Sequence, residues 1–159
     1  MQFSINRQAF IKALNDVSRA ISSRTTIPIL TNIKILLNDE ELVLTGSNAD
    51  ISIETRIDQS DTAAQLVIKK TGGITLPATF FSNIGKNLPA DDMTLAVEGV
   101  RASITSGASD FTINGQDVRN YPQLPEMDDV QSLSVSAAQL IDIISQTKIS
   151  ASTQESRPI

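Results

Sequence analysis

The sequence predicts an α+β fold made of short helices and antiparallel strands. Of its 159 residues 40% are hydrophobic but only 4% are aromatic, so the core must consist of Ile, Leu and Val, which favour sheets. One stretch near the N-terminus has helical periodicity, whereas most of the rest alternates between apolar and polar residues. The length suits one domain, or one domain and the beginning of another.

The first helix is expected over residues 7 to 20, after Asn6, which is a good N-cap. Its apolar residues recur at helical spacing and are Phe10, Leu14, Val17 and Ile21. At about 100° per residue, Lys12 and Arg19 lie on the opposite face. That outward face is polar and mildly basic, with Asp16 interrupting it, and a face that is merely solvated would have the same pattern.

Strands dominate the middle of the chain. Alternating apolar residues predict an antiparallel meander through Ile33, Ile35 and Leu37, then Leu42 and Leu44, then Ile51, Ile53 and Ile57. Another strand is expected at Leu66 to Lys69, and Gly72-Gly73 is expected to form a turn. Later strands carry Met93, Leu95 and Val97, then Val100, Ala102 and Ile104, then Phe111 and Ile113.

A second, shorter helix is expected from about Pro77 to Leu88. Proline is favoured in the first turn of a helix, so Pro77 marks its start. We expect Phe80, Phe81 and Ile84 to point inward from it.

The stretch from Gln116 to Asp129 breaks all periodicity and predicts a linker. Beyond it, Leu133 and Val135 alternate, and residues 136–139 (SAAQ) have the pattern of a capping box ahead of a helix. This strand and helix can be laid on residues 2–29 at an offset of 130 residues. Asn6 then falls on Ser136, Phe10 on Leu140, Leu14 on Ile144, Arg24 on Gln154, and Pro28-Ile29 on Pro158-Ile159.

The shared order of elements and caps indicates a tandem repeat of whole domains. We expect a first domain at residues 1–120, a linker at 121–130 and the start of a second domain at 131–159. One strand and one helix cannot bury their apolar faces alone, so the second copy is expected to be truncated. Residues 131–159 should therefore be poorly ordered or packed on a neighbouring molecule.

Composition restricts the chemistry. The chain contains no His and no Cys, which excludes imidazole- or thiolate-based nucleophilic catalysis and ordinary zinc sites. Carboxylates such as Asp91-Asp92 remain, and they lie beside turn signals where solvated acids are common. The net charge of −5 argues against a generally basic nucleic-acid binder but leaves room for a local basic face. No apolar run spans a membrane and no signal peptide is evident, so we expect an intracellular protein.

With these residues considered, the chain resembles the beta subunit of bacterial DNA polymerase III, the sliding clamp, across its whole length. The residues that carry the resemblance are the opening MQFSI, RTTIPIL at 24–30, LTG at 44–46, ISIE at 51–54, NYPQL at 120–124 and the closing SRPI at 156–159. The resemblance implies the DNA-clamp fold, with two helices and two antiparallel sheets per domain and three domains per chain. Two chains would close into a ring, a homodimer, around duplex DNA.

The resemblance also implies roles for individual residues. Arg24 and Gln154 match DNA-contacting positions, and Lys12 and Arg19 would supply phosphate attraction inside the ring. Phe111 and Ile113 match positions at the dimer interface, and residues 157–159 begin a cleft for polymerase and clamp-loader peptides. The implied function is a cytoplasmic, non-catalytic processivity factor without a cofactor. Its partners would be DNA, a second clamp chain, the replicative polymerase and the clamp loader.

Each role has an alternative. Arg24 could form an ion pair with an acid, and Phe111 and Ile113 could be ordinary core residues. The whole chain could be an acidic β-rich interaction module that never meets DNA. A metal-dependent hydrolase or nuclease using Asp91-Asp92 is the enzymatic alternative.

Overall fold

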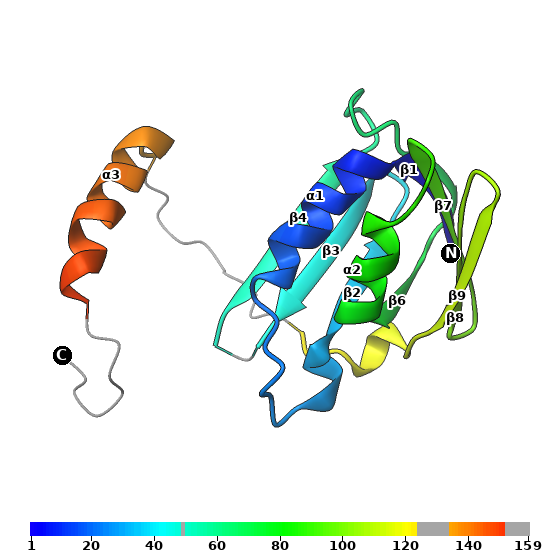
Figure 1. The fold of residues 1–159 in the computed structure, drawn as a ribbon, viewed down its shortest axis with the longest axis horizontal. Helices are drawn as coiled ribbons and strands as arrows, with labels where there is room; N and C mark the ends of the chain where they lie inside the picture. Colours follow the sequence, from blue (N-terminus) through cyan, green and yellow to red (C-terminus); the bar gives the residue numbers. More distant parts are fainter. Residues whose placement is uncertain (49, 124–133, 152–159) are drawn as a thin grey trace. The chain divides into compact units, whose positions relative to one another are not determined.

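The computed structural model describes residues 1–48, 50–123 and 134–151 (Figure 1). The chain divides into two compact units, Met1–Leu124 and Pro125–Ile159. This division lies within the predicted linker at residues 121–130. The limits predicted for the two domains, 1–120 and 131–159, remain a prediction.

The first unit contains two antiparallel sheets. One has the strand order β5-β1-β7-β8-β9, with β5 (Val67–Lys70), β1 (Gln2–Asn6), β7 (Asp92–Glu98), β8 (Arg101–Ser106) and β9 (Ser109–Asn114). The other has the order β4-β3-β2-β6, with β4 (Ser52–Asp58), β3 (Glu41–Ser47), β2 (Asn32–Leu37) and β6 (Gly72–Pro77). Every neighbouring pair is antiparallel, which confirms the predicted meander.

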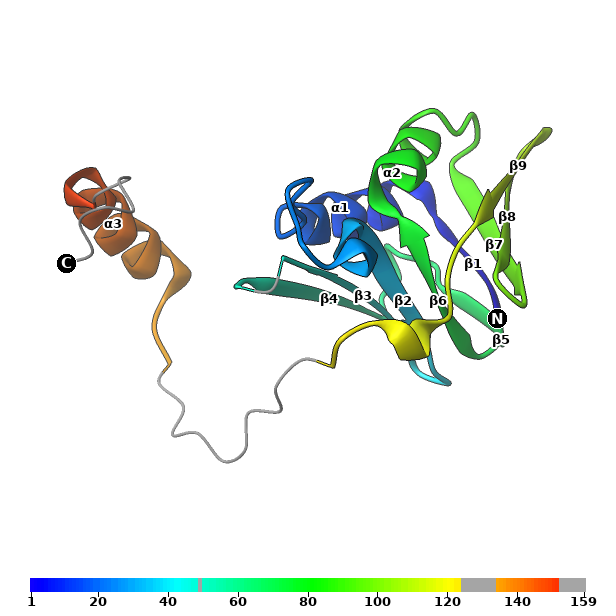
Figure 2. The same cartoon turned by 90° about the horizontal axis from the view of Figure 1, so that it is seen from below.

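Two helices lie side by side on one side of the sheets, as both views of the ribbon show (Figures 1 and 2). They are α1 (Arg7–Ser18) and α2 (Ala78–Lys86). Three phenylalanines join the layers, because the ring of Phe10 lies 6.2 Å from that of Phe3 on β1 and 5.5 Å from that of Phe81 on α2. The core between the layers therefore fixes where the outward faces of both helices point.

Helix α1 begins as its sequence predicts. The Asn6 side chain accepts hydrogen bonds from the backbone N–H groups of Gln8 (2.9 Å) and Ala9 (3.2 Å), which would otherwise lack partners. Its apolar face is buried and consists of Phe10, Ala13, Leu14 and Val17. The helix ends at Ser18, two residues before the predicted end. The prediction of an amphipathic helix is confirmed.

Phe80, which was predicted to point inward, and Ile51, which was predicted as a strand residue, are both exposed. Phe80 is 69% exposed, because it neighbours the buried Phe81 and successive helical residues point about 100° apart. Ile51 is 58% exposed, because the Asn48 side chain accepts from the N–H groups of Asp50 and Ile51 and forms a turn there. Strand β4 begins only at Ser52.

Gly72 and Gly73 do not form the predicted turn. They open strand β6 and pair with Leu37 and Leu36 of β2. A Cβ on Gly73 would lie 2.7 Å from the Leu36 side chain, so close approach between strands explains this glycine.

The loss of periodicity at Gln116 does not mark the start of a linker. Gln116 and Thr75 exchange backbone hydrogen bonds of 3.0 Å, and Val118–Asn120 forms a 3₁₀ turn capped by Asp117. Tyr121 is only 4% exposed, and this burial raises the pKa of its phenol. Residues up to Tyr121 therefore pack on the first unit.

The second unit has one helix, α3 (Ala137–Thr147), followed by a 3₁₀ turn at Lys148–Ser150. The Ser136 hydroxyl accepts from the Gln139 N–H at 3.2 Å, which is the same cap contact that Asn6 makes with Ala9, 130 residues earlier. Leu133 lies outside the described residues, and Val135 is exposed and not part of a strand. The predicted helix is thus confirmed, whereas the repeat beyond it remains a prediction.

Candidate nucleic-acid interface

The outward faces of α1 and α2 form one polar surface, which we call the helical face. Both helices bury their apolar sides against the sheets, so their other sides point to solvent on the same side of the unit (Figure 2). The exposed polar residues of the helical face are Gln8, Lys12, Asn15, Arg19, Thr79, Asn83 and Lys86, and the exposed Phe80 lies among them on α2. The predicted outward position of Lys12 and Arg19 is therefore what the structure shows.

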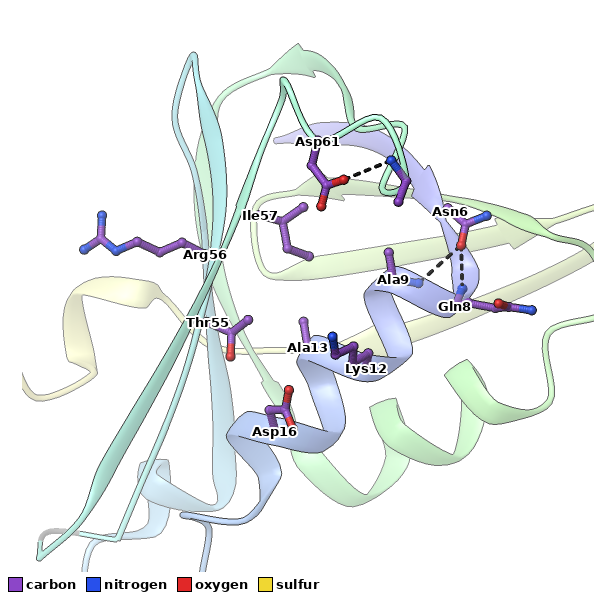
Figure 3. Close-up of a pocket in the computed structure, with 11 residues that line it drawn as sticks. Asn6, Gln8, Ala9, Lys12, Ala13, Asp16, Thr55, Arg56, Ile57 and Asp61 are labelled. Carbon is purple, nitrogen blue, oxygen red and sulfur yellow. Dashed lines mark hydrogen bonds between the residues drawn. The ribbon is translucent and has the colours of Figure 1, made fainter. Parts of the chain in front are cut away.

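Lys12 lies beside a hollow of about 550 Å³ between α1 and β4 (Figure 3). Figure 3 shows Arg56 of β4 pointing away from this hollow. The Arg56 guanidinium instead pairs with the carboxylates of Glu41 (2.8 Å) and Glu54 (2.7 Å). Lys12 takes part in no ion pair among the described residues, so its charge remains available to a ligand.

Arg19 is only partly available. Its guanidinium lies 3.7 Å from the Asp16 carboxylate, one helical turn earlier, and both groups are well exposed. Such a surface pair is weak and is screened by salt, so an incoming anion can displace Asp16 at little cost.

Arg24 lies in an exposed but ordered loop between α1 and the 3₁₀ turn Pro28–Thr31. The Ser22 hydroxyl accepts from the Arg24 N–H at 3.1 Å, and the Thr25 hydroxyl accepts from the Ile27 N–H at 3.1 Å. No carboxylate of residues 1–48, 50–123 or 134–151 pairs with the Arg24 guanidinium, so the alternative of an ion pair has no support there. The loop therefore presents an uncompensated positive charge.

Helix α2 contributes residues that we did not predict. Lys86 is exposed in its last turn, and Thr79 and Asn83 precede it on the same side at spacings of seven and three residues. The helical-wheel reasoning applied to the first helix would have found them, because Phe81 and Gly85 define the buried side.

The predicted dimer-interface residues differ from each other. Ile113 is 8% exposed and belongs to the core, whereas Phe111 is only partly buried against it. Both lie on β9, which is the last strand of its sheet and pairs only with β8. Phe111 and the free edge of β9 are thus the features open to a partner.

The structure says less about the other residues that were predicted to have a role. Gln154 and residues 157–159 lie outside the described residues. Asp91 uses its backbone carbonyl to accept from the Arg7 N–H at 2.8 Å, and within the described part of the chain no three His, Cys, Asp or Glu side chains gather as metal ligands. None of the helices described is long and apolar enough to cross a membrane.

Comparison with known proteins identifies the family. Residues 1–125 match the family described as the N-terminal domain of the DNA polymerase III beta subunit. The chain belongs to this family. The match covers the two sheets, both helices and the loop that carries Arg24.

Relatives in this family are similar over the whole chain. The beta sliding clamp of Staphylococcus epidermidis is 44% identical and that of Staphylococcus aureus 43% identical, each over 100% of this chain. The beta chain of DNA polymerase III from Streptococcus pneumoniae superposes with a TM-score of 0.95 at 42% identity, over 99% of this chain and 42% of its own. The sliding clamp of Bacillus subtilis gives a TM-score of 0.94 at 39% identity. This chain spans 43% of the length of the Staphylococcus relatives.

Proposed function

We propose that this chain provides the first domain, and the start of the second, of a DNA sliding clamp. The clamp is a ring-forming, non-catalytic processivity factor of bacterial chromosomal replication. It tethers DNA polymerase III to duplex DNA without sequence specificity and needs no cofactor to slide. The relatives that support this proposal are named as beta sliding clamps or as beta chains of DNA polymerase III.

The observation that carries the proposal is the sign of the charge on the helical face and its adjoining loop. The chain has a net charge of −5. Four exposed cations nevertheless lie on this surface, namely Lys12, Arg19, Arg24 and Lys86. Asp16 lies between Lys12 and Arg19 on α1, and it is already paired with Arg19. Local positive charge attracts the phosphate backbone although the whole chain is acidic, because screening limits repulsion from distant acids.

These residue types suit a ring that slides. Lysine and arginine side chains that bind phosphates fix position and affinity, but they carry no information about base sequence. Gln154, at the position equivalent to Arg24 in the second copy, is proposed to add a neutral contact of the same kind.

The partners are part of the proposal. A second clamp chain would pair with the free edge of β9 beside Phe111 and close the ring as a homodimer. A clamp loader would open the ring, and the replicative polymerase would bind a cleft that includes residues 157–159. We place the protein in the cytoplasm, where the bacterial chromosome lies.

Replacing Arg24 tests the contact with DNA. In the full-length protein, Arg24→Ala should weaken binding to all duplex sequences alike and reduce the slope of log K against log salt by ~0.9 for the lost phosphate contact. The measurement is fluorescence anisotropy of labelled duplexes of different sequence over a salt series.

Arg119→Ala is the matched control for this experiment. The Arg119 guanidinium already pairs with Asp117, and residues 118–120 lie on the opposite side of the sheets from the helices (Figure 2). Its replacement should leave both affinity and slope unchanged. A loss on Arg24→Ala that depends on the base sequence would contradict the proposal.

A further inference from the structure

A second feature of the surface beside Arg24 is a hollow lined by hydroxyl groups. It has a volume of about 490 Å³ and opens where α1 ends and α2 begins. We call it the hydroxyl hollow, and its hydroxyl-bearing residues are Ser18, Ser22, Ser23, Thr31, Thr79 and Ser82. Asn83 adds a side-chain amide, and no ionisable side chain lines the hollow.

Two of these hydroxyls are already used as donors. The Ser18 hydroxyl donates to the Leu14 carbonyl at 2.6 Å, and the Thr31 hydroxyl donates to the Pro28 carbonyl at 2.8 Å. They form part of the wall but have no proton to offer a ligand.

The other hydroxyls have protons free. Ser22 only accepts, from the Arg24 N–H, so its own proton can still be donated. Within the described part of the chain, the hydroxyls of Ser23, Thr79 and Ser82 make no hydrogen bond. The hollow therefore collects four available O–H donors from two separate segments of the chain.

This composition differs from that of the two neighbouring hollows along α1. Those hollows combine cations such as Lys12 with the Asp16 carboxylate, and one of them also with the Asp61 carboxylate, so an anion there meets both attraction and repulsion. The hydroxyl hollow has no carboxylate in its lining. Neutral donors make strong, short hydrogen bonds to an ionised acceptor, and hydroxyls are common partners of backbone phosphates.

We propose that the hydroxyl hollow holds one phosphodiester of the duplex, with Ser22, Ser23, Thr79 and Ser82 donating to its oxygens. The inference rests on the proposed function, because the ligand is the same DNA that Arg24 contacts. The Ser22–Arg24 hydrogen bond links the two contacts, so the hollow and the guanidinium take neighbouring positions along one strand. Uncharged donors add affinity for DNA here, but they release no counterions and so leave the salt dependence of binding unchanged.

The test uses the full-length protein with three donors removed at once, as Ser23→Ala, Thr79→Val and Ser82→Ala. All three sites lie on the surface or at the wall of the hollow, and a thermal melt checks that the variant folds. Thr71→Val is the matched control, because Thr71 is an exposed hydroxyl in the turn between β5 and β6 and lies outside the hollow. Binding is measured by anisotropy with a labelled duplex over a salt series in chloride buffer.

The expected result is a loss of affinity on the order of a hundredfold for the triple variant, which corresponds to about fivefold for each lost donor. Its slope of log K against log salt should equal that of the unchanged protein, because no cation is lost. Arg24→Ala, in contrast, should reduce the slope by ~0.9. This difference in slope separates the two kinds of contact.

Two results would overturn the inference. If the triple variant binds as tightly as the Thr71 control while Arg24→Ala weakens binding, the hollow holds no phosphodiester of the duplex, although the proposed function stands. A hollow that takes only free phosphate gives this result too. If the unchanged protein shows no salt-dependent affinity for duplex DNA at all, the proposed function fails and the inference fails with it.

Discussion

Gly46 shows how a single residue sets the position of helix α1. It lies on β3 where the last turn of α1 crosses the sheet, and a Cβ there would lie 2.2 Å from the Val17 carbonyl oxygen. No side chain fits in that space, so glycine allows the helix to pack this closely. The position of Arg24, a few residues beyond the end of α1, depends on this contact.

We expect Gly46→Ala to destabilise the protein by about 2–3 kcal/mol, because either the helix or the strand must move. Gly85→Ala is the matched control. A Cβ on Gly85 would meet Leu14 at 3.6 Å and Ile11 at 3.8 Å, which is ordinary contact, so helix propensity should stabilise that variant by roughly 0.5–1 kcal/mol. Urea unfolding measures both changes, and equal effects of the two substitutions would contradict the packing described.

The sequence alone predicts the position and role of some residues better than those of others. The outward position of Lys12 follows from helical geometry and needs no structure. The role of Arg24 does not, because an arginine in a loop has no periodicity, and it was predicted only through the resemblance to the clamp family. The exposure of Phe80 was missed because two adjacent aromatic residues have the composition of a core, although the helical spacing of Phe81 and Gly85 places Phe80 on the outward side.

At the scale of elements, α1 and α3 begin with the same kind of cap. Their caps, Asn6 and Ser136, make the same contact at an offset of 130 residues, yet α1 buries its apolar side and α3 does not. Ile144, the equivalent of the buried Leu14, is 51% exposed. An apolar face of this kind requires cover, which supports the proposal that a second clamp domain is built around α3.

Ile144→Asp tests that proposal in the full-length protein. We expect it to cost about 3 kcal/mol, because a charge would be placed where a sheet should cover the helix. Ser145→Asp places the same charge on a neighbouring side of α3 and should be nearly neutral. Denaturant unfolding followed by circular dichroism provides the comparison, and indistinguishable variants would mean that this face stays exposed.

The edge strand β9 gives a prediction about assembly. Phe111→Asp should raise the dissociation constant of the homodimer on the order of a hundredfold, because the carboxylate would be desolvated in the interface. Val67→Asp changes an exposed residue on β5, at the opposite edge of the same sheet, and should leave the dimer intact. Sedimentation equilibrium measures the dimer dissociation constant of both variants. If only Val67→Asp dissociates the dimer, the interface lies at the β5 edge and the prediction for β9 is wrong.

The elements were predictable where one periodicity ran without interruption, as in α1 and most strands. The prediction failed where the backbone followed tertiary contacts. Gly72 and Gly73 have the composition of a turn but pair with β2, since the partner strand leaves no room for side chains. Tyr121 lies in a stretch without periodicity, and only its burial shows that the first unit extends this far.

For the whole molecule, an acidic net charge and a basic helical face can both be consistent with DNA binding only if the basic residues lie close to the phosphates and the acidic residues lie far from them. A ring around DNA satisfies this requirement, because the helical faces would line the channel while acidic residues keep the outside soluble. The chain spans 43% of the length of the Staphylococcus clamps, so ring closure remains part of the proposal and is tested with the full-length protein.

The most direct measurement of encirclement is retention of the full-length protein on circular DNA. The labelled clamp is placed on a nicked plasmid by its loader and ATP, separated from free protein by gel filtration, and followed before and after the plasmid is linearised. A topologically linked ring should stay on the circle through high salt and leave within minutes of linearisation. Equal retention on circular and linear DNA, or none on either, would contradict the sliding-clamp proposal and favour an interaction module that does not encircle DNA.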